Sequence, residues 1–151
     1  MQGEWRKDDA ALDSGGQVYR RVKRCPSHYV HPDPVTGTPI VGNAALRYQL
    51  DGMSVTLGQI MATEDLDVSD LCKWDDYTVV RFLVKDVRHL LGGVVASVDA
   101  EDSNAKRGLS HGLVRTANPP PDKDAWAEFR DGLRRIMTVR VARDSDWCAT
   151  N

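Results

Sequence analysis

The sequence DKDAWAEFRDGLRRIM, residues 122–137, contains the most regular apolar pattern in the chain. Its apolar side chains recur at intervals that place them on one face of an α-helix; they are Trp126, Phe129, Leu133, Ile136 and Met137. Asp122 is a residue type that often caps a helix, and the three prolines before it form a stiff boundary. The stretch therefore predicts an amphipathic helix that buries one face against the rest of the fold.

Several stretches before this helix are rich in β-branched and aromatic residues, which favour strands. They are residues 17–24, 53–57, 77–84, 93–98 and 110–116. Four prolines between residues 25 and 42 remove backbone donors, so that segment is predicted to be a long irregular connection. Together these elements predict an α+β fold, in which a mainly antiparallel sheet of about five short strands is covered by the amphipathic helix near the C-terminus.

Length and composition favour one folded domain. The chain has 151 residues, of which 41% are hydrophobic and 28% charged, and one core usually serves about 100–200 residues. We expect a single domain at residues 17–143, a mobile N-terminal tail at 1–16 and a C-terminal tail at 144–151, in which Trp147 is the residue able to dock. No apolar run approaches the roughly 20 residues of a membrane span. With three cysteines, the sequence predicts a cytoplasmic protein that has no membrane partner.

The net charge of −2 conceals three charged blocks. Residues 17–31 carry four basic and no acidic side chains, and residues 51–76 carry seven acidic side chains against one lysine. Residues 123–143 carry six basic and three acidic side chains. Such blocks are either solvated faces whose opposite charges partly cancel or separate surfaces that bind partners.

The sequence carries few motifs for cofactors or metals. The chain contains neither the dinucleotide-binding fingerprint nor the P-loop pattern. Cys25, His28 and His31 follow one another at three-residue intervals, and thiolate and imidazole are good Zn²⁺ ligands. Their spacing lacks the paired arrangement of a zinc finger. The sequence therefore predicts no cofactor and no metal, with these three residues as weak candidate ligands and Cys72, His111 or Asp33 as a candidate fourth.

Two other patterns point to chemistry. His111 stands in an apolar strand-like stretch, where a histidine serves either as a general base near neutral pH or as a hydrogen-bonded structural residue. Basic and aromatic side chains are interleaved in the first basic block, an arrangement typical of single-stranded nucleic-acid binding and equally of an ordinary solvated surface. They are Tyr19, Arg20, Arg21, Lys23, Arg24 and Tyr29, with Arg130, Arg134 and Arg135 of the predicted helix as an extension.

Further segments stand in a characteristic order. They are Tyr19-Arg20-Arg21-Val22, Asn43-Ala44-Ala45-Leu46-Arg47, Asp51-Gly52-Met53-Ser54-Val55 and Ser110-His111-Gly112-Leu113-Val114. This order resembles a family of small uncharacterised bacterial proteins with R-x-x-P, [ST]-A-A-[FL]-[RK], D-G-x-S-V and A-H-[AG]-x-V segments, and the resemblance covers about residues 17–116. The chain departs from it at Gly42-Asn43, where a hydroxyl pair is usual, and at Ser110, where alanine is usual. The resemblance implies no activity, but it groups Arg47, Asp51, Ser54 and His111 as a candidate polar cluster.

Three hypotheses of function follow. The preferred one is a small bacterial accessory module that binds a protein partner within a multi-gene system. It is preferred because the charged residues are grouped in blocks along the chain and no catalytic motif is complete. The alternative is a small hydrolase or transferase acting on a phosphate-bearing or nucleotide substrate. His111 would be its acid/base, Arg47 or Arg20 its anion clamp, and Asp51 or Ser54 a positioning group. The second alternative is a nucleic-acid-binding module. Convergence of these side chains on one pocket would favour the enzyme.

Overall fold

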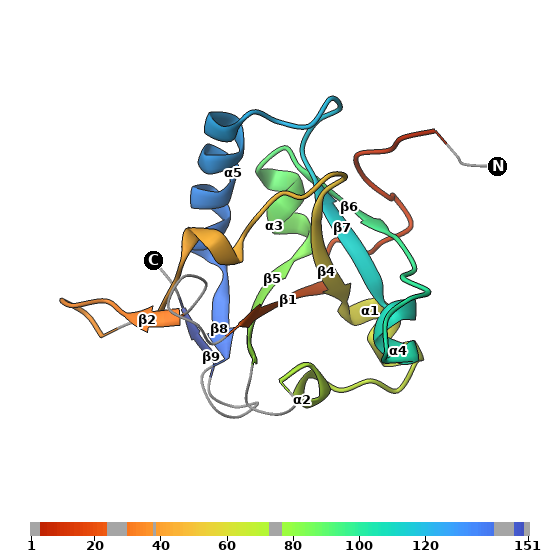
Figure 1. Cartoon of the computed structure of the whole chain (residues 1–151), viewed down its shortest axis with the longest axis horizontal. Coiled ribbons are helices and arrows are strands. Elements are labelled where there is room, and N and C mark those ends of the chain that lie inside the picture. The colour runs from red at the N-terminus through yellow and green to blue at the C-terminus, as the bar shows by residue number, and fades with distance from the viewer. Residues whose placement is uncertain (1–3, 24–29, 38, 73–76, 141–146, 150–151) are drawn as a thin grey trace.

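The sheet at the centre of the structure has seven strands, each antiparallel to its neighbours. The computed structural model describes residues 4–23, 30–37, 39–72, 77–140 and 147–149. In spatial order the strands are β6 (Gly93–Ala96), β7 (His111–Arg115), β4 (Met53–Leu57), β1 (Gln17–Lys23), β5 (Tyr77–Leu83), β8 (Thr138–Arg140) and β9 (Trp147–Ala149). A separate antiparallel pair is formed by β2 (Val30–Pro32) and β3 (Pro39–Val41) (Figure 1). The predicted α+β fold with an antiparallel sheet is confirmed.

Helices lie against both faces of this sheet. They are α1 (Gly58–Thr63), α2 (Val68–Leu71), α3 (Val84–His89), α4 (Ala105–Leu109) and α5 (Lys123–Ile136), with a 3₁₀ turn, η1, at Asn43–Ala45. The longest helix of the described residues, α5, has 14 residues. A bilayer span needs about 20, and no helix in the described part of the chain is both long and apolar enough to cross a membrane.

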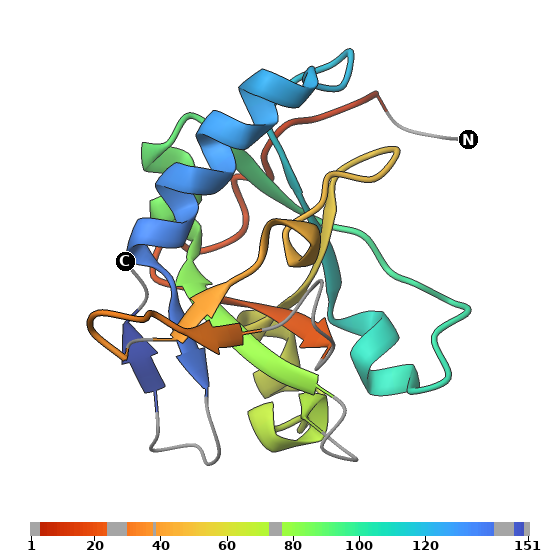
Figure 2. The same cartoon turned by 60° about the vertical axis from the view of Figure 1, so that its left-hand side comes forward.

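The predicted amphipathic helix is α5, and its start is confirmed: the Asp122 carboxylate accepts the N–H of Ala125 at 2.7 Å. Trp126, Phe129 and Leu133 are buried in the larger core, beside α3 (Figure 2). Burying a side chain of this size stabilises the fold by about 1.5–3 kcal/mol. The prediction is wrong for Ile136, which is 43% exposed. Ile136 is the last residue of α5, just before the chain enters β8, so its side chain stays at the surface.

A smaller core lies on the opposite face of the sheet. Met61 of α1 and Leu71 of α2 pack there against Tyr19 of β1 and Val79 of β5. The alternate residues of the two strands, such as Val18 and Val80, belong to the larger core. Strands β1 and β5 are therefore buried on both faces, and they form the rigid centre of the molecule.

The predicted tails hold ordered structure. On the N-terminal side, the amide of Asp9 donates to the Val94 carbonyl at 2.8 Å, and Leu12 is buried in the larger core. The Arg88 side chain of α3 binds Asp8 at 3.2 Å and the Leu12 carbonyl at 2.9 Å. On the C-terminal side, Trp147 begins β9, and residues 4–16 and 147–149 are thus both placed against the sheet.

Candidate functional site

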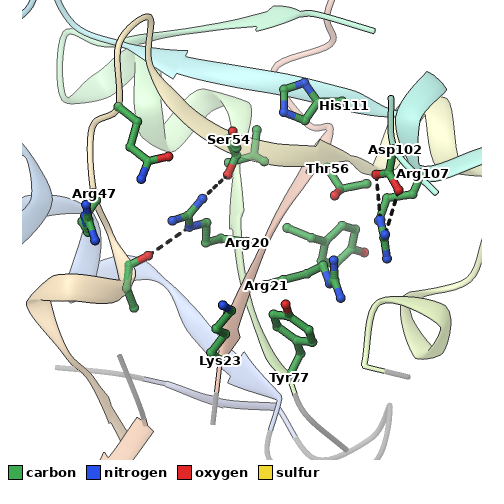
Figure 3. Close-up of a pocket in the computed structure, with 14 residues that line it drawn as sticks. Arg20, Arg21, Lys23, Arg47, Ser54, Thr56, Tyr77, Asp102, Arg107 and His111 are labelled. Carbon is green, nitrogen blue, oxygen red and sulfur yellow. Dashed lines mark hydrogen bonds and ion pairs between the residues drawn. The ribbon is translucent and has the colours of Figure 1, made fainter. Parts of the chain in front are cut away.

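Strands β1 and β4 separate from each other after a short paired region. β1 pairs with β5 at seven positions, but with β4 only at Val18↔Leu57 and Tyr19↔Thr56. A cavity of about 410 Å³ opens beyond these pairs, and we call it the cleft (Figure 3). It is lined by Arg20, Arg21 and Lys23 of β1, and by residues of the 45–49 segment, β4, β5, α4 and β7. The cleft therefore arises because two central strands diverge.

Arg20 fills the gap between the diverging strands. Its Nε donates to the Ala45 carbonyl at 3.0 Å, and one terminal nitrogen donates to the Ser54 carbonyl of β4 at 2.8 Å (Figure 3). The guanidinium thus binds a carbonyl in the region where the two strands no longer pair. Desolvation, and then the charge of Arg47, lower the pKa of Arg20 to about 10. Among the described residues no carboxylate forms an ion pair with Arg20, so it presents a half-buried positive charge that a ligand can neutralise.

Arg21 is fixed on the other side of β1. Its Nε donates to the Leu71 carbonyl at 3.1 Å, and its guanidinium carbon lies 3.8 Å from the centre of the Tyr77 ring. Desolvation, and then the charge of Arg107, lower the pKa of Arg21. A cation stacked on an aromatic ring is held in place while its outer N–H groups stay available.

The single acid among the lining residues is already paired. The two carboxylate oxygens of Asp102 accept hydrogen bonds from Arg107 at 2.8 and 2.7 Å. This pairing lowers the pKa of Asp102 and raises that of Arg107. Among the described residues that line the cleft, one acid therefore stands against five cations, which are Arg20, Arg21, Lys23, Arg47 and Arg107 (Figure 3).

His111 lines the cleft from β7, where it lies opposite Thr56 of β4. Its Nδ1 lies 2.6 Å from the Ser97 carbonyl oxygen. Because a carbonyl can only accept, Nδ1 carries the hydrogen in this contact, and Nε2 of the neutral ring carries the lone pair. On β4, the exposed Ser54 and the buried Thr56 also line the cleft. The described part of the cleft thus combines an excess of cations with hydroxyl groups and a histidine of defined tautomer.

The sequence-based candidates can now be placed. Arg20, Arg47, Ser54 and His111 line the same cleft. Asp51 does not line it, because its carboxylate binds Arg115 at 2.9 Å, at the end of β7. Four of the five proposed catalytic and substrate-binding residues therefore converge.

The candidate metal ligands fall largely outside the described residues. Cys25 and His28 lie outside the described residues, and His31 is placed only as part of the backbone of β2. Within the described ranges, no three histidine, cysteine or carboxylate side chains form a group able to hold a metal ion.

Sequence reasoning missed Tyr77, Asp102 and Arg107 as cleft residues. Tyr77 reaches the cleft because β5 pairs with β1 in the register Lys23↔Tyr77. Arg107 reaches it from α4, whose start is capped by Asn104 through a 3.1 Å bond to the Arg107 amide. The one feature of the sequence that pointed to Asp102 and Arg107 was that residues 99–107 shortly precede His111.

Comparisons of the chain with protein-family models, curated proteins and solved structures gave no match. Inference about function therefore depends on the geometry of the cleft.

Proposed function

We propose that this protein binds a phosphate-bearing ligand of about nucleotide size in the cleft. The observation that carries the proposal is the convergence of Arg20, Arg21, Lys23 and Arg47 on one cavity, where the single acid among the described lining residues is already paired with Arg107. A volume of about 410 Å³ lies in the usual range for small-molecule sites, about 300–1,000 Å³. An anion of two or more charges is the ligand that such a set of cations favours.

Guanidinium groups supply the geometry that phosphate recognition needs. Each carries five N–H donors in a planar fork that matches two phosphate oxygens. Arg20 donates two of these N–H groups to the carbonyls of Ala45 and Ser54, and these hydrogen bonds hold the guanidinium in place before a ligand binds. Its remaining donors and those of Arg47 would bind the phosphate. Pre-positioned donors lose little conformational entropy on binding, which strengthens affinity.

The protein-partner hypothesis stays a prediction based on the charge blocks alone. Three residues of the basic block at 17–31, namely Arg20, Arg21 and Lys23, line the cleft. A phosphate ligand therefore accounts for that block without a protein partner, which is why we favour the ligand.

Calorimetric titration of the purified chain with inorganic phosphate, AMP and ATP tests the binding proposal. We expect micromolar to millimolar affinity that rises with the number of phosphates, because each added charge meets unbalanced cations. Arg47→Ala should weaken ATP binding about tenfold or more, since a charge-assisted contact contributes about 1.5–3 kcal/mol. Arg47 is exposed and has no hydrogen bond within the described structure, so this variant should fold.

The matched control is Arg135→Ala, which removes an exposed arginine of α5 that does not line the cleft. It should bind ATP like the wild type. The proposal is wrong if the wild-type chain binds none of the three probes, or if the Arg47 and Arg135 variants bind ATP equally well.

A second function, hydrolysis or transfer of the bound phosphate ester, is favoured by the contact between His111 and Ser97. That contact leaves Nε2 with the lone pair that a general base needs. In the proposed step Nε2 takes the proton of an attacking hydroxyl group, the new oxygen–phosphorus bond forms and the bond to the leaving oxygen breaks. Phosphorus NMR of a nucleotide panel incubated with the protein measures turnover. His111→Gln should abolish it, and equal turnover in the variant and the wild type would exclude this role.

A further inference from the structure

A second cavity, of about 510 Å³, lies between the 46–50 segment and the start of α5, and we call it the α5 groove. Arg47 lines both the α5 groove and the cleft. Figure 3 shows Arg47 at the edge of the cleft opposite the Asp102–Arg107 pair. The two cavities are therefore neighbours that share one cation, which is the arrangement required by a ligand that extends from one into the other.

The α5 groove carries an excess of positive charge. Arg47, Lys123 and Arg130 line it, with Asp122 as the one acid among its lining residues. The Asp122 carboxylate already accepts the Ala125 amide at the start of α5. The Nε of Arg130 has no hydrogen-bond partner in the described part of the chain, but it forms an ion pair with Asp131 at 3.8 Å, so the excess charge comes from Arg47 and Lys123. The groove therefore favours an anion, as the cleft does.

The remaining surface of the α5 groove is apolar and aromatic. Tyr48 is half-buried and meets Trp126 edge-on, with ring centres 5.0 Å apart. Pro120, Pro121 and Leu50 also line the groove, and the side chain of Leu50 is 95% exposed. Flat apolar side chains between cations suit a ligand in which flat rings alternate with negative charges.

We propose that the cleft and the α5 groove together bind a single-stranded oligonucleotide, with one phosphate in the cleft, the next at Lys123 in the groove and a base against Tyr48. The inference rests on the proposed function, because it takes the phosphate site of the cleft as its starting point. Each cavity supplies cations and an aromatic ring, Tyr77 in the cleft and Tyr48 in the groove. The Tyr77 ring is already stacked with Arg21, but an acidic peptide would satisfy the cations without giving the Tyr48 ring a base to stack on.

Fluorescence anisotropy with labelled oligonucleotides tests this inference. The probes are oligouridylate and oligothymidylate of two, four and eight nucleotides, and competition with unlabelled UMP gives the affinity for one nucleotide. We expect affinity to rise at least tenfold from one to four nucleotides and then to level off. The two sugar types separate RNA from DNA as the source of the ligand. Affinity should also fall steeply with salt, because binding releases counterions from the phosphates.

Two variants locate the second contact. Lys123→Ala should lower the affinity for the eight-nucleotide probe about tenfold and reduce the salt slope by about one. Lys85→Ala, which removes an exposed lysine of α3 that lines neither cavity, should leave both unchanged. Tyr48→Leu should weaken the same probe while Tyr48→Phe restores it, since stacking needs the ring and not the hydroxyl group.

The outcomes separate this inference from the proposed function. Binding of UMP without any gain from added nucleotides overturns the inference and leaves the phosphate site standing. Equal oligonucleotide affinity of the Lys123 and Lys85 variants also overturns it. Displacement of the probe by polyglutamate as effectively as by unlabelled oligonucleotide assigns the groove to an acidic peptide and overturns it as well. If neither UMP nor ATP binds, both the proposed function and the oligonucleotide inference are wrong.

Discussion

The two edges of strand β1 differ in how far they pair with the neighbouring strand. Toward β5 it is paired along its full length, from Gln17↔Leu83 to Lys23↔Tyr77. Toward β4 it is paired at two positions, and Arg20 occupies the gap that follows. The paired side holds the fold together, whereas the open side exposes backbone acceptors and cations to a ligand. One strand thus supports both stability and binding because its neighbours diverge on one side only.

The largest expected effect lies on the paired side. Phe82 of β5 is paired with Val18, is 2% exposed and belongs to the larger core. Phe82→Ala should lower the free energy of unfolding by about 3–5 kcal/mol, because it removes a buried ring and leaves a cavity. Urea unfolding followed by circular dichroism measures this change. Val98→Ala, at a side chain that is 62% exposed, should change stability by less than about 0.5 kcal/mol. A loss below about 1 kcal/mol for Phe82→Ala would show that the paired side is not the main source of stability.

Much of this paired side could be predicted from the sequence, because its signals are local. Gln17–Lys23 and Tyr77–Leu83 have the composition of strands, and the spacing of Trp126, Phe129 and Leu133 marks one face of a helix. Strands β8 and β9 have three residues each and were missed. Segments of this length contain too few residues to show a periodic pattern, and their pairing with β5 and with each other depends on the rest of the fold.

The open side could be predicted only in part. The composition of the basic block pointed to Arg20, and the family resemblance grouped Arg47, Ser54 and His111, all of which line the cleft. The resemblance also included Asp51, which instead pairs with Arg115. Sequence order does not reveal that β1 and β4 diverge after two paired positions, so neither the cleft nor the contribution of Arg107 was visible. The location of a site between strands depends on register, which is a property of the assembled sheet.

A smaller effect is expected at the far edge of the cleft, where Asp102 binds Arg107. The side chains are 13% and 19% exposed, so Asp102→Asn should cost about 1–2 kcal/mol at pH 7, between the values for exposed and buried pairs. The hydrogen bonds from Arg107 lower the pKa of Asp102 in the folded chain. The stability that the carboxylate contributes is therefore present above the ordinary aspartate pKa of about 3.9 and is lost as the pH falls through the lowered pKa.

Urea unfolding of the wild type and of Asp102→Asn at pH 7 and at about pH 2.5 measures this dependence. The difference between the two proteins should shrink at the lower pH, because the wild-type carboxyl group then begins to take up its proton. An equal difference at both pH values would mean that the ion pair does not contribute to stability at the open side.

The smallest effect on stability, and the sharpest test of the contrast between the two sides, is expected for Arg20→Met. The change removes the bonds to the Ala45 and Ser54 carbonyls, each contributing about 0.5–1.5 kcal/mol. It also removes a desolvated cation that no described carboxylate balances, and it keeps the length of the apolar stem. The two consequences oppose each other, and water in the open cleft can reach the freed carbonyls. We expect a change of less than about 1 kcal/mol in the free energy of unfolding, together with a loss of ATP binding of at least tenfold.

Arg135→Met should change neither quantity. A loss of several kcal/mol for Arg20→Met with unaltered ATP affinity would reverse the assignment, because the arginine would then hold the strands together rather than serve a ligand.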